Sequence, residues 1–266
     1  MRASAPPLGR APLRLVAGGA VGVVFLALPV AALVVSAPWD RLWSLVTAPE
    51  ARQAMWLSLW TSTLAATICL VLGLPLAWLL ARVDFAGRRV VRALVAVPMV
   101  LPPVVGGVAL LSAFGRHGVV GAPLRELFGT QIPYTTTAVV LAHTFVALPF
   151  FVISLEGALR GTSTRLETAA ATLGADRWTT FHRVTLPLVM PGLIAGLVLA
   201  WARSLGEFGA TITFAGNYPG TTRTMPLEIY TMLQEDPDAA VALSVVLLAA
   251  CVGVLVLLRE RWWGVR

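Results

Sequence analysis

The chain lacks lysine altogether, and all 20 of its basic side chains are arginines. A P-loop ATPase places a lysine on the nucleotide phosphates, so this chain cannot supply such a site by itself. Any ATP that drives the protein must therefore be hydrolysed on another polypeptide. Cysteine is also scarce. Cys69 and Cys251 both lie in apolar runs without metal-ligand spacing, which argues against a disulfide or a zinc site.

Charge is scarce as well. Only 12% of the 266 residues are charged, about half the fraction of an ordinary soluble domain, and 58% are hydrophobic. Lipid must therefore solvate much of the chain. The apolar runs are continuous and long enough to cross a bilayer core, which favours helices over strands. We expect an all-α integral membrane protein with one domain at 13–258, whose six transmembrane helices span about residues 13–35, 55–80, 93–114, 135–158, 188–209 and 239–258.

The placement of arginine predicts the orientation in the membrane. With six crossings, both termini and the second and fourth loops share one side, which carries 14 arginines against five on the other. Arginine-rich loops stay inside, so residues 1–12 and 259–266 are expected to be cytoplasmic tails of an inner-membrane protein. The first run could instead be a signal peptide, but it is longer than a signal core. The net charge of +7 then reflects topology, and no nucleic acid partner is expected.

Proline and glycine interrupt the third apolar run at Leu101-Pro-Pro-Val-Val-Gly-Gly107. Irregular backbone is tolerated in a membrane only inside protein or beside water. The stretch is therefore either a packing kink or part of a translocation path, with Pro102, Pro103 and Gly106 as candidates. His143 is either a proton or metal ligand or a packing residue, and no metal site is expected. The turn formers between Thr211 and Pro237 predict an outer loop.

The fourth loop is the longest cytoplasmic connection and has a helical pattern. Thr164-Arg-Leu-Glu167 predicts a capping box, Gly174 a left-handed helix end, and Asp176 the cap of a second short helix. The apolar stripe of these helices needs a partner, which could be lipid headgroups or a groove on a cytoplasmic protein. The periodicity alone leaves both open. The stripe consists of Leu166, Ala169, Ala170 and Leu173, followed by Trp178 and Phe181.

The stretch Glu167-Thr-Ala-Ala-Ala-Thr-Leu-Gly-Ala175, with Leu186-Pro187 after it, resembles the cytoplasmic signature of bacterial ABC-importer permeases, E-A-A, then G, then L-P. Thr168 replaces the first alanine, and Glu167 lies seven residues before Gly174 where many members have six. The resemblance implies a type I permease fold whose coupling helix sits in a cleft of an ATP-binding subunit. The residues implied to contact that subunit are Leu166, Glu167, Ala169, Ala170, Leu173, Gly174, Trp178 and Phe181.

The segment from Leu199 to Asn217 resembles the molybdate permease branch, in which A-R-x-L-G-E-F-G-A-T precedes a G-N turn. The sulfate and thiosulfate branch usually reads G-E-Y-G-S there, so Phe208 and Ala210 favour molybdate, and tungstate is not distinguished. The resemblance implies a homodimer in membrane lipid with two ATP-binding cassette subunits and a periplasmic or external molybdate-binding protein. ATP and Mg²⁺ would sit on the partner ATPase, and this chain would bind no cofactor and hold no catalytic residue.

Two charges fall inside the fifth apolar run, where each costs about 2.5–3.5 kcal/mol. Arg203 and Glu207 are four residues apart, so they can pair on one helix face. The pair either locks the helix, or Arg203 contacts the passing dianion. Conduction needs weak binding, which suits neutral donors. The remaining candidates for the path are therefore Ser204, Gly206, Gly209, Thr211 and Thr213.

Three alternatives remain at this point. A sulfate or thiosulfate permease would have the same architecture. A secondary transporter driven by an ion gradient would not need the coupling loop. An intramembrane enzyme would need converging catalytic groups, but His117, His143 and His182 fall in different segments without metal-type spacing.

Overall fold

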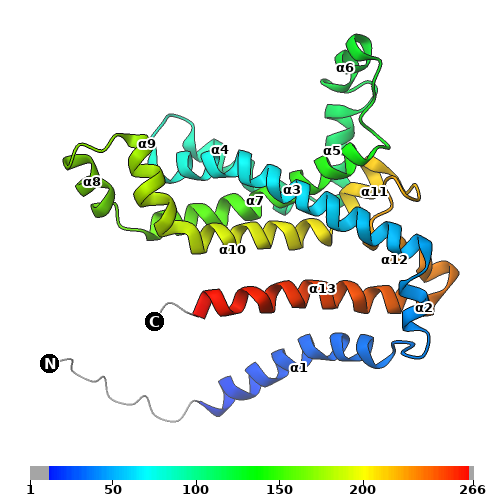
Figure 1. Cartoon of the computed structure of the whole chain (residues 1–266). Coiled ribbons are helices and arrows are strands. Elements are labelled where there is room, and N and C mark those ends of the chain that lie inside the picture. Colours follow the sequence, from blue (N-terminus) through cyan, green and yellow to red (C-terminus); the bar gives the residue numbers. More distant parts are fainter. Residues whose placement is uncertain (1–11, 264–266) are drawn as a thin grey trace.

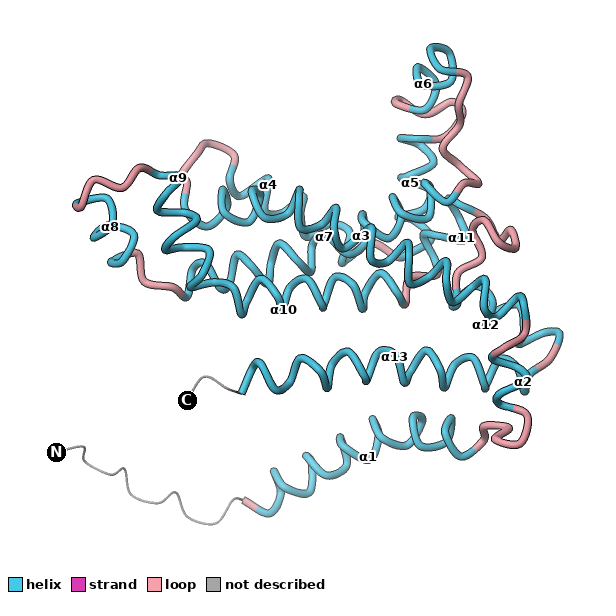
Figure 2. Tube along the Cα trace, viewed as in Figure 1, coloured by secondary structure: helices cyan, strands magenta, loops and turns pink. Residues whose placement is uncertain are grey.

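The computed structural model describes residues 12–263, and their side chains as far as Val254 and at Val256. The expected tails therefore lie outside the described residues, apart from Pro12 and the backbone of 259–263. The described part is helical and contains no strand, as expected (Figures 1 and 2). Its helices are α1 (Leu13–Val35), α2 (Leu42–Val46), α3 (Pro49–Arg82), α4 (Arg88–Val100), α5 (Pro103–Phe114), α6 (Gly121–Phe128), α7 (Thr136–Gly161), α8 (Arg165–Thr172), α9 (Arg177–Thr180), the π-helix η1 (Phe181–Thr185), α10 (Leu186–Leu205), α11 (Gly209–Ala215), α12 (Met225–Glu235) and α13 (Pro237–Trp263).

The core forms where α3, α7 and α10 lie side by side. Small residues let these helices approach closely, as in other membrane bundles. A Cβ on Gly73 would lie 2.5 Å from the Phe151 ring, and one on Gly192 would lie 2.3 Å from the Ala158 Cβ. Figure 1 shows α8 and α9 at one end of this bundle and α11 and α12 at the other. The bundle therefore separates these two groups of short helices.

Among the described residues, five helical segments are long and apolar enough to cross a membrane, one of them running from α9 through η1 to the end of α10. Helices α4 and α5 would make a sixth crossing if the two count as one. The irregular backbone expected within the third run, at about 93–114, is a bend of 119° between α4 and α5. Leu101 is extended (ψ 135°), and Pro102 and Pro103 follow it, so neither can donate a backbone N–H to continue the helix. The bend turns α5 out of the line of α4, so that it packs against α11 and α7 with α6 beyond it (Figure 1).

The expected fifth helix and outer loop also differ from the structure. Helix α10 ends at Leu205 rather than near 209, and the segment expected to be a loop contains α11 and α12. Tertiary contacts stabilise these short helices: the Met225 N–H donates to the Ser58 hydroxyl at 2.7 Å, and Leu227 is fully buried. The turn formers of the sequence occupy only the connection from Gly216 to Thr224.

Helix α1 stands apart from the core. It has no buried residue, and it lies along α13 rather than against the bundle. Its apolar side chains therefore need lipid or another chain around them.

Candidate functional site

Helices α8 and α9 form a bent projection beyond the ends of α3 and α10. Gly174 turns the chain between them at φ +86°, the left-handed conformation expected of it. The expected cap of the second helix is confirmed, because the Asp176 carboxylate accepts the Thr179 N–H at 2.9 Å. Hydrogen bonds from Thr179 lower the pKa of Asp176 below its usual value, so the cap stays ionised near neutral pH. The projection thus has two well-defined short helices.

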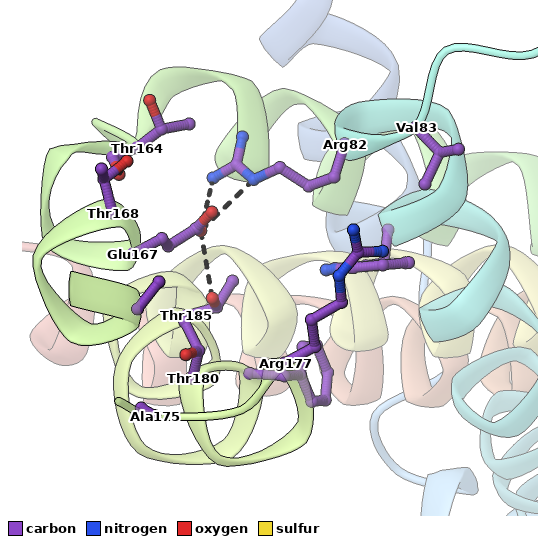
Figure 3. A pocket seen from close by; sticks show the side chains of 12 residues that line it. Arg82, Val83, Thr164, Glu167, Thr168, Ala175, Arg177, Thr180 and Thr185 are labelled. Atoms are coloured by element: carbon purple, nitrogen blue, oxygen red, sulfur yellow. Dashed lines mark hydrogen bonds and ion pairs between the residues drawn. The ribbon is translucent and has the colours of Figure 1, made fainter. Parts of the chain in front are cut away.

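Glu167 joins this projection to the bundle (Figure 3). Its Oε1 accepts from Arg82 Nη2 at 2.9 Å and Nε at 3.3 Å, at the last residue of α3, and from the Thr185 hydroxyl at 3.0 Å in η1. The capping box predicted for Thr164 and Glu167 is wrong. The Thr164 side chain makes no cap bond, and the Glu167 carboxylate binds the Arg82 guanidinium and the Thr185 hydroxyl instead of reaching back to the start of α8.

A cavity of about 440 Å³ lies beneath α8, with the Arg82–Glu167 pair among its lining residues (Figure 3). The aromatic rings of Trp78 and Phe181 meet edge to face at its rim, with centroids 6.4 Å apart. Trp78, Arg82 and Thr185 were not predicted from the sequence. Arg82 is 85 residues from Glu167, and no local pattern indicates such a contact.

The outer face of the projection carries unpartnered apolar side chains. Leu173 is 90% exposed, and Leu166 and Trp178 are also exposed, as is Ala169. Ala170 is half-buried, and Phe181 turns inward against Trp78, so it anchors α9 to α3. Exposed apolar patches of this kind mark interaction sites. The projection is therefore fixed at its base and free at its surface.

At the other end of the bundle, Arg203 and Glu207 form the pair expected from their spacing, but in a different geometry. Arg203 Nη2 lies 2.8 Å from Glu207 Oε2, and Glu207 follows the end of α10 instead of lying within it. Its second oxygen accepts the Ala210 N–H at 2.8 Å in the first turn of α11. The Glu207 side chain is 1% exposed and Arg203 29%. The carboxylate thus fastens the end of α10 to the start of α11.

The two backbone breaks meet at this place. A Cβ on Gly209 would lie 2.4 Å from the Pro103 Cβ, and one on Gly107 would lie 2.5 Å from the Thr213 Cβ. Helices α5 and α11 therefore need glycine to pack this closely. Gly107 was not among the predicted site residues, although the same glycine pair contains the predicted Gly106, whose missing Cβ faces Phe145.

The remaining predicted path residues divide by exposure. Pro102, Pro103 and Gly206 are exposed at the breaks, whereas Gly106, Gly209, Ser204 and Thr211 are buried. The hydroxyls of Ser204 and Thr211 and both ring nitrogens of His143 find no hydrogen-bond partner among the described residues. Thr213 donates to the Gly209 carbonyl within its own helix. Among the side chains that the structure describes, no group of three could hold a metal ion.

Comparison with known proteins agrees with this geometry. The family described as binding-protein-dependent transport system inner membrane component matches residues 70–264. The molybdenum transport system permease protein ModB of Mycobacterium bovis is 54% identical over 226 residues, which is 85% of each chain. The sulfate transport system permease protein CysT of Escherichia coli K12 is 38% identical over 231 residues, covering 85% of this chain and 83% of that one.

The fold has a solved counterpart. A bacterial ABC transporter involved in the import of the acidic polysaccharide alginate superimposes with a TM-score of 0.73 at 19% identity, covering 94% of this chain and 93% of that chain. The expected fold of an ABC-importer permease is thereby confirmed, as is the resemblance to the molybdate permease branch. The chain belongs to the binding-protein-dependent transport system inner membrane component family and is a multi-pass inner-membrane protein.

Proposed function

We propose that this chain is the permease subunit of an ABC importer that moves molybdate into the cell by alternating access. Its greater identity to a molybdenum permease than to a sulfate permease is the observation that carries the proposal. Phe208 and Ala210 support it, because they lie at the Glu207 junction between α10 and α11, where the two branches differ. Tungstate shares the chemistry of molybdate and would be carried as well.

The projection formed by α8 and α9 is the contact to the motor in this proposal. Its exposed Leu166, Leu173 and Trp178 would insert into a groove of an ATP-binding cassette subunit, as amphipathic helices do in other complexes. Two such subunits would bind ATP and Mg²⁺, because this lysine-free chain offers no phosphate-binding loop. ATP binding would open the path outward, and hydrolysis with phosphate release would reset it inward.

The path itself would lie between two copies of the chain. Helices α4 and α5 both expose apolar side chains, including Leu94, Val100, Val104 and Val108, which a second copy would cover. The breaks at Pro102 and Gly206 would then face the two-fold axis. Both termini would lie in the cytoplasm with α8 and α9, and a periplasmic or external molybdate-binding protein would deliver cargo on the other side.

Uptake measurements test the cargo. Proteoliposomes that hold the full transporter, with binding protein outside and ATP inside, should accumulate labelled molybdate, and unlabelled molybdate should compete at least tenfold better than sulfate. Stronger competition by sulfate would favour a sulfate or thiosulfate permease, the alternative that the similarity to CysT supports. Uptake that vanadate leaves unchanged would instead favour an ion-gradient transporter.

Leu173→Asp tests the proposed contact to the motor. In the proposed complex the ATP-binding subunit would bury the Leu173 side chain, and losing a buried leucine costs about 1.5–3 kcal/mol. Co-purification of the ATP-binding subunit should therefore fall on the order of tenfold or more. Cargo-stimulated ATP hydrolysis should fall with it. Val119→Asp is the matched control, because it adds the same charge at a similarly exposed residue between α5 and α6. Equal co-purification for both variants would rule out the assigned contact.

A further inference from the structure

A hollow rich in arginine lies at the same end of the bundle as α8, but outside the projection. It occupies about 570 Å³ between the turn that joins α3 to α4 and the end of α7. Volumes of a few hundred Å³ are typical of ligand sites. Four guanidinium groups line the hollow, from Arg88, Arg89, Arg92 and Arg160, and Asp84 is the one carboxylate in its lining.

Two of these arginines are held by a buried carboxylate behind them. Glu156 on α7 is 8% exposed, and its Oε1 accepts from Arg92 Nη2 at 2.6 Å and from Arg160 Nε at 2.9 Å. Because both arginines share one oxygen, a single negative charge fixes two positive ones. This arrangement holds the guanidinium groups in place without neutralising them.

The carbonyl oxygen of Leu80 accepts hydrogen bonds from both of these arginines and from Arg88. It accepts from Arg88 Nε at 2.9 Å, and from Arg92 Nη2 and Arg160 Nη2 at 3.4 Å each. The carbonyl lies in the last turn of α3, where the helix dipole is negative and attracts cations. Three arginines from α4 and α7 are thereby oriented around one point.

Positive charge is left over after these contacts. The four arginines face two carboxylates, Asp84 and Glu156, and the Asp84 side chain is 96% exposed where it meets Arg88. Arg89 is exposed and forms no ion pair with any side chain that the structure describes. The Nη1 groups of Arg92 and Arg160 likewise donate to no described residue. Donors on three guanidinium groups therefore remain available beside the hollow.

We propose that this hollow binds a tetrahedral oxyanion of the phosphate type. A planar guanidinium group can donate two parallel hydrogen bonds to a pair of phosphate oxygens. Four such groups line this one hollow. The anion would be either the phosphodiester of an anionic lipid in the inner leaflet or a free phosphate-like ion in the cytoplasm. The site is separate from the Arg203–Glu207 pair, because it lies at the ends of α3 and α7 near α8, whereas the pair lies at the far end of α10, a helix about 30 Å long.

The test uses the intact transporter with full-length permease and two probes. Native mass spectrometry in detergent measures binding of phosphatidylglycerol against phosphatidylcholine. Thermal unfolding in nanodiscs of phosphatidylcholine alone measures stabilisation by inorganic phosphate. The variants are Arg89→Gln and Arg89→Glu, because Arg89 supports no other residue and its loss leaves the Glu156 contacts intact. Arg165→Gln and Arg165→Glu are the matched controls, at an exposed arginine of α8.

If the lipid is the source, phosphatidylglycerol should bind more tightly than phosphatidylcholine, and Arg89→Gln should weaken it about fivefold, as expected for one basic side chain at an anionic surface. If a free ion is the source, phosphate should raise the unfolding temperature, and Arg89→Glu should abolish the rise. Arg165 variants should change neither. If Arg89 and Arg165 variants behave alike with both probes, the proposal is overturned. Neither measurement requires transport, so a negative result would contradict the oxyanion site without bearing on the proposed function.

Discussion

Arg203→Gln should destabilise the protein far more than Glu207→Gln, although the two residues form one pair. Loss of Arg203 leaves a carboxylate that is 1% exposed with only the Ala210 N–H for compensation. Breaking a buried pair in this way costs about 3–5 kcal/mol. Loss of the Glu207 charge leaves a guanidinium that is 29% exposed and can hydrate, and the glutamine oxygen can still accept from Ala210. That loss should cost about 1–2 kcal/mol.

Thermal unfolding of the purified transporter measures this asymmetry. The double variant Arg203→Gln with Glu207→Gln is the control, because it removes both charges and should be more stable than Arg203→Gln alone. The same double variant separates the two roles left open for Arg203. A stable double variant that still imports molybdate assigns the pair to structure, whereas a stable one without uptake assigns Arg203 to the anion. Equal destabilisation by both single variants would contradict the burial argument.

Glu167→Gln and Arg82→Gln should each reduce cargo-stimulated ATP hydrolysis on the order of tenfold, while the ATP-binding subunit stays bound. The pair joins α8 to α3, and a hydrogen bond to a charged group is worth about 1.5–3 kcal/mol. Losing it should lower the ratio of attached to detached α8 by about tenfold or more. The outer apolar face would remain, so docking would persist while the movement of α8 no longer reaches the bundle.

The exchange of charges, Arg82→Glu with Glu167→Arg, should recover part of the lost stimulation, because it restores an attractive pair at the same place. Arg177→Gln serves as the control, since Arg177 lines the same cavity without an ion pair within the described residues (Figure 3). The assay is ATP hydrolysis with and without loaded binding protein. An exchange variant no better than either single variant would show that the pair does not transmit the movement.

Local features of α8 and α9 could be predicted from the sequence. Gly174 and Asp176 act within a few residues of themselves, so their roles as helix end and cap follow from residue type and position. The Arg82–Glu167 contact could not be predicted, because it joins segments far apart in the chain. The capping box failed for the same reason, since a charged partner from another helix outweighed a local hydrogen bond.

The region where α5, α10 and α11 meet shows the same division. The proline cluster predicted irregular backbone near Leu101, but neither the angle of 119° nor the packing of α5 against α11 could be predicted from it. The spacing of Arg203 and Glu207 predicted their pairing, yet the helix ends between them. Helices α11 and α12 were missed because their short segments have turn formers nearby, and burial of residues such as Leu227 and Phe214 decides their structure.

Helix α1 contributes no buried side chain, whereas α3, α7 and α10 meet through glycines that admit no larger residue. Natural selection therefore acts differently on these segments. In α1 any apolar residue can be accommodated as long as the helix keeps its length, so we expect its sequence to vary more between species. A substitution at Gly73 or Gly192 must instead be matched by one in the facing helix. Related permeases should accordingly diverge fastest at their amino-terminal helix and co-vary across the bundle.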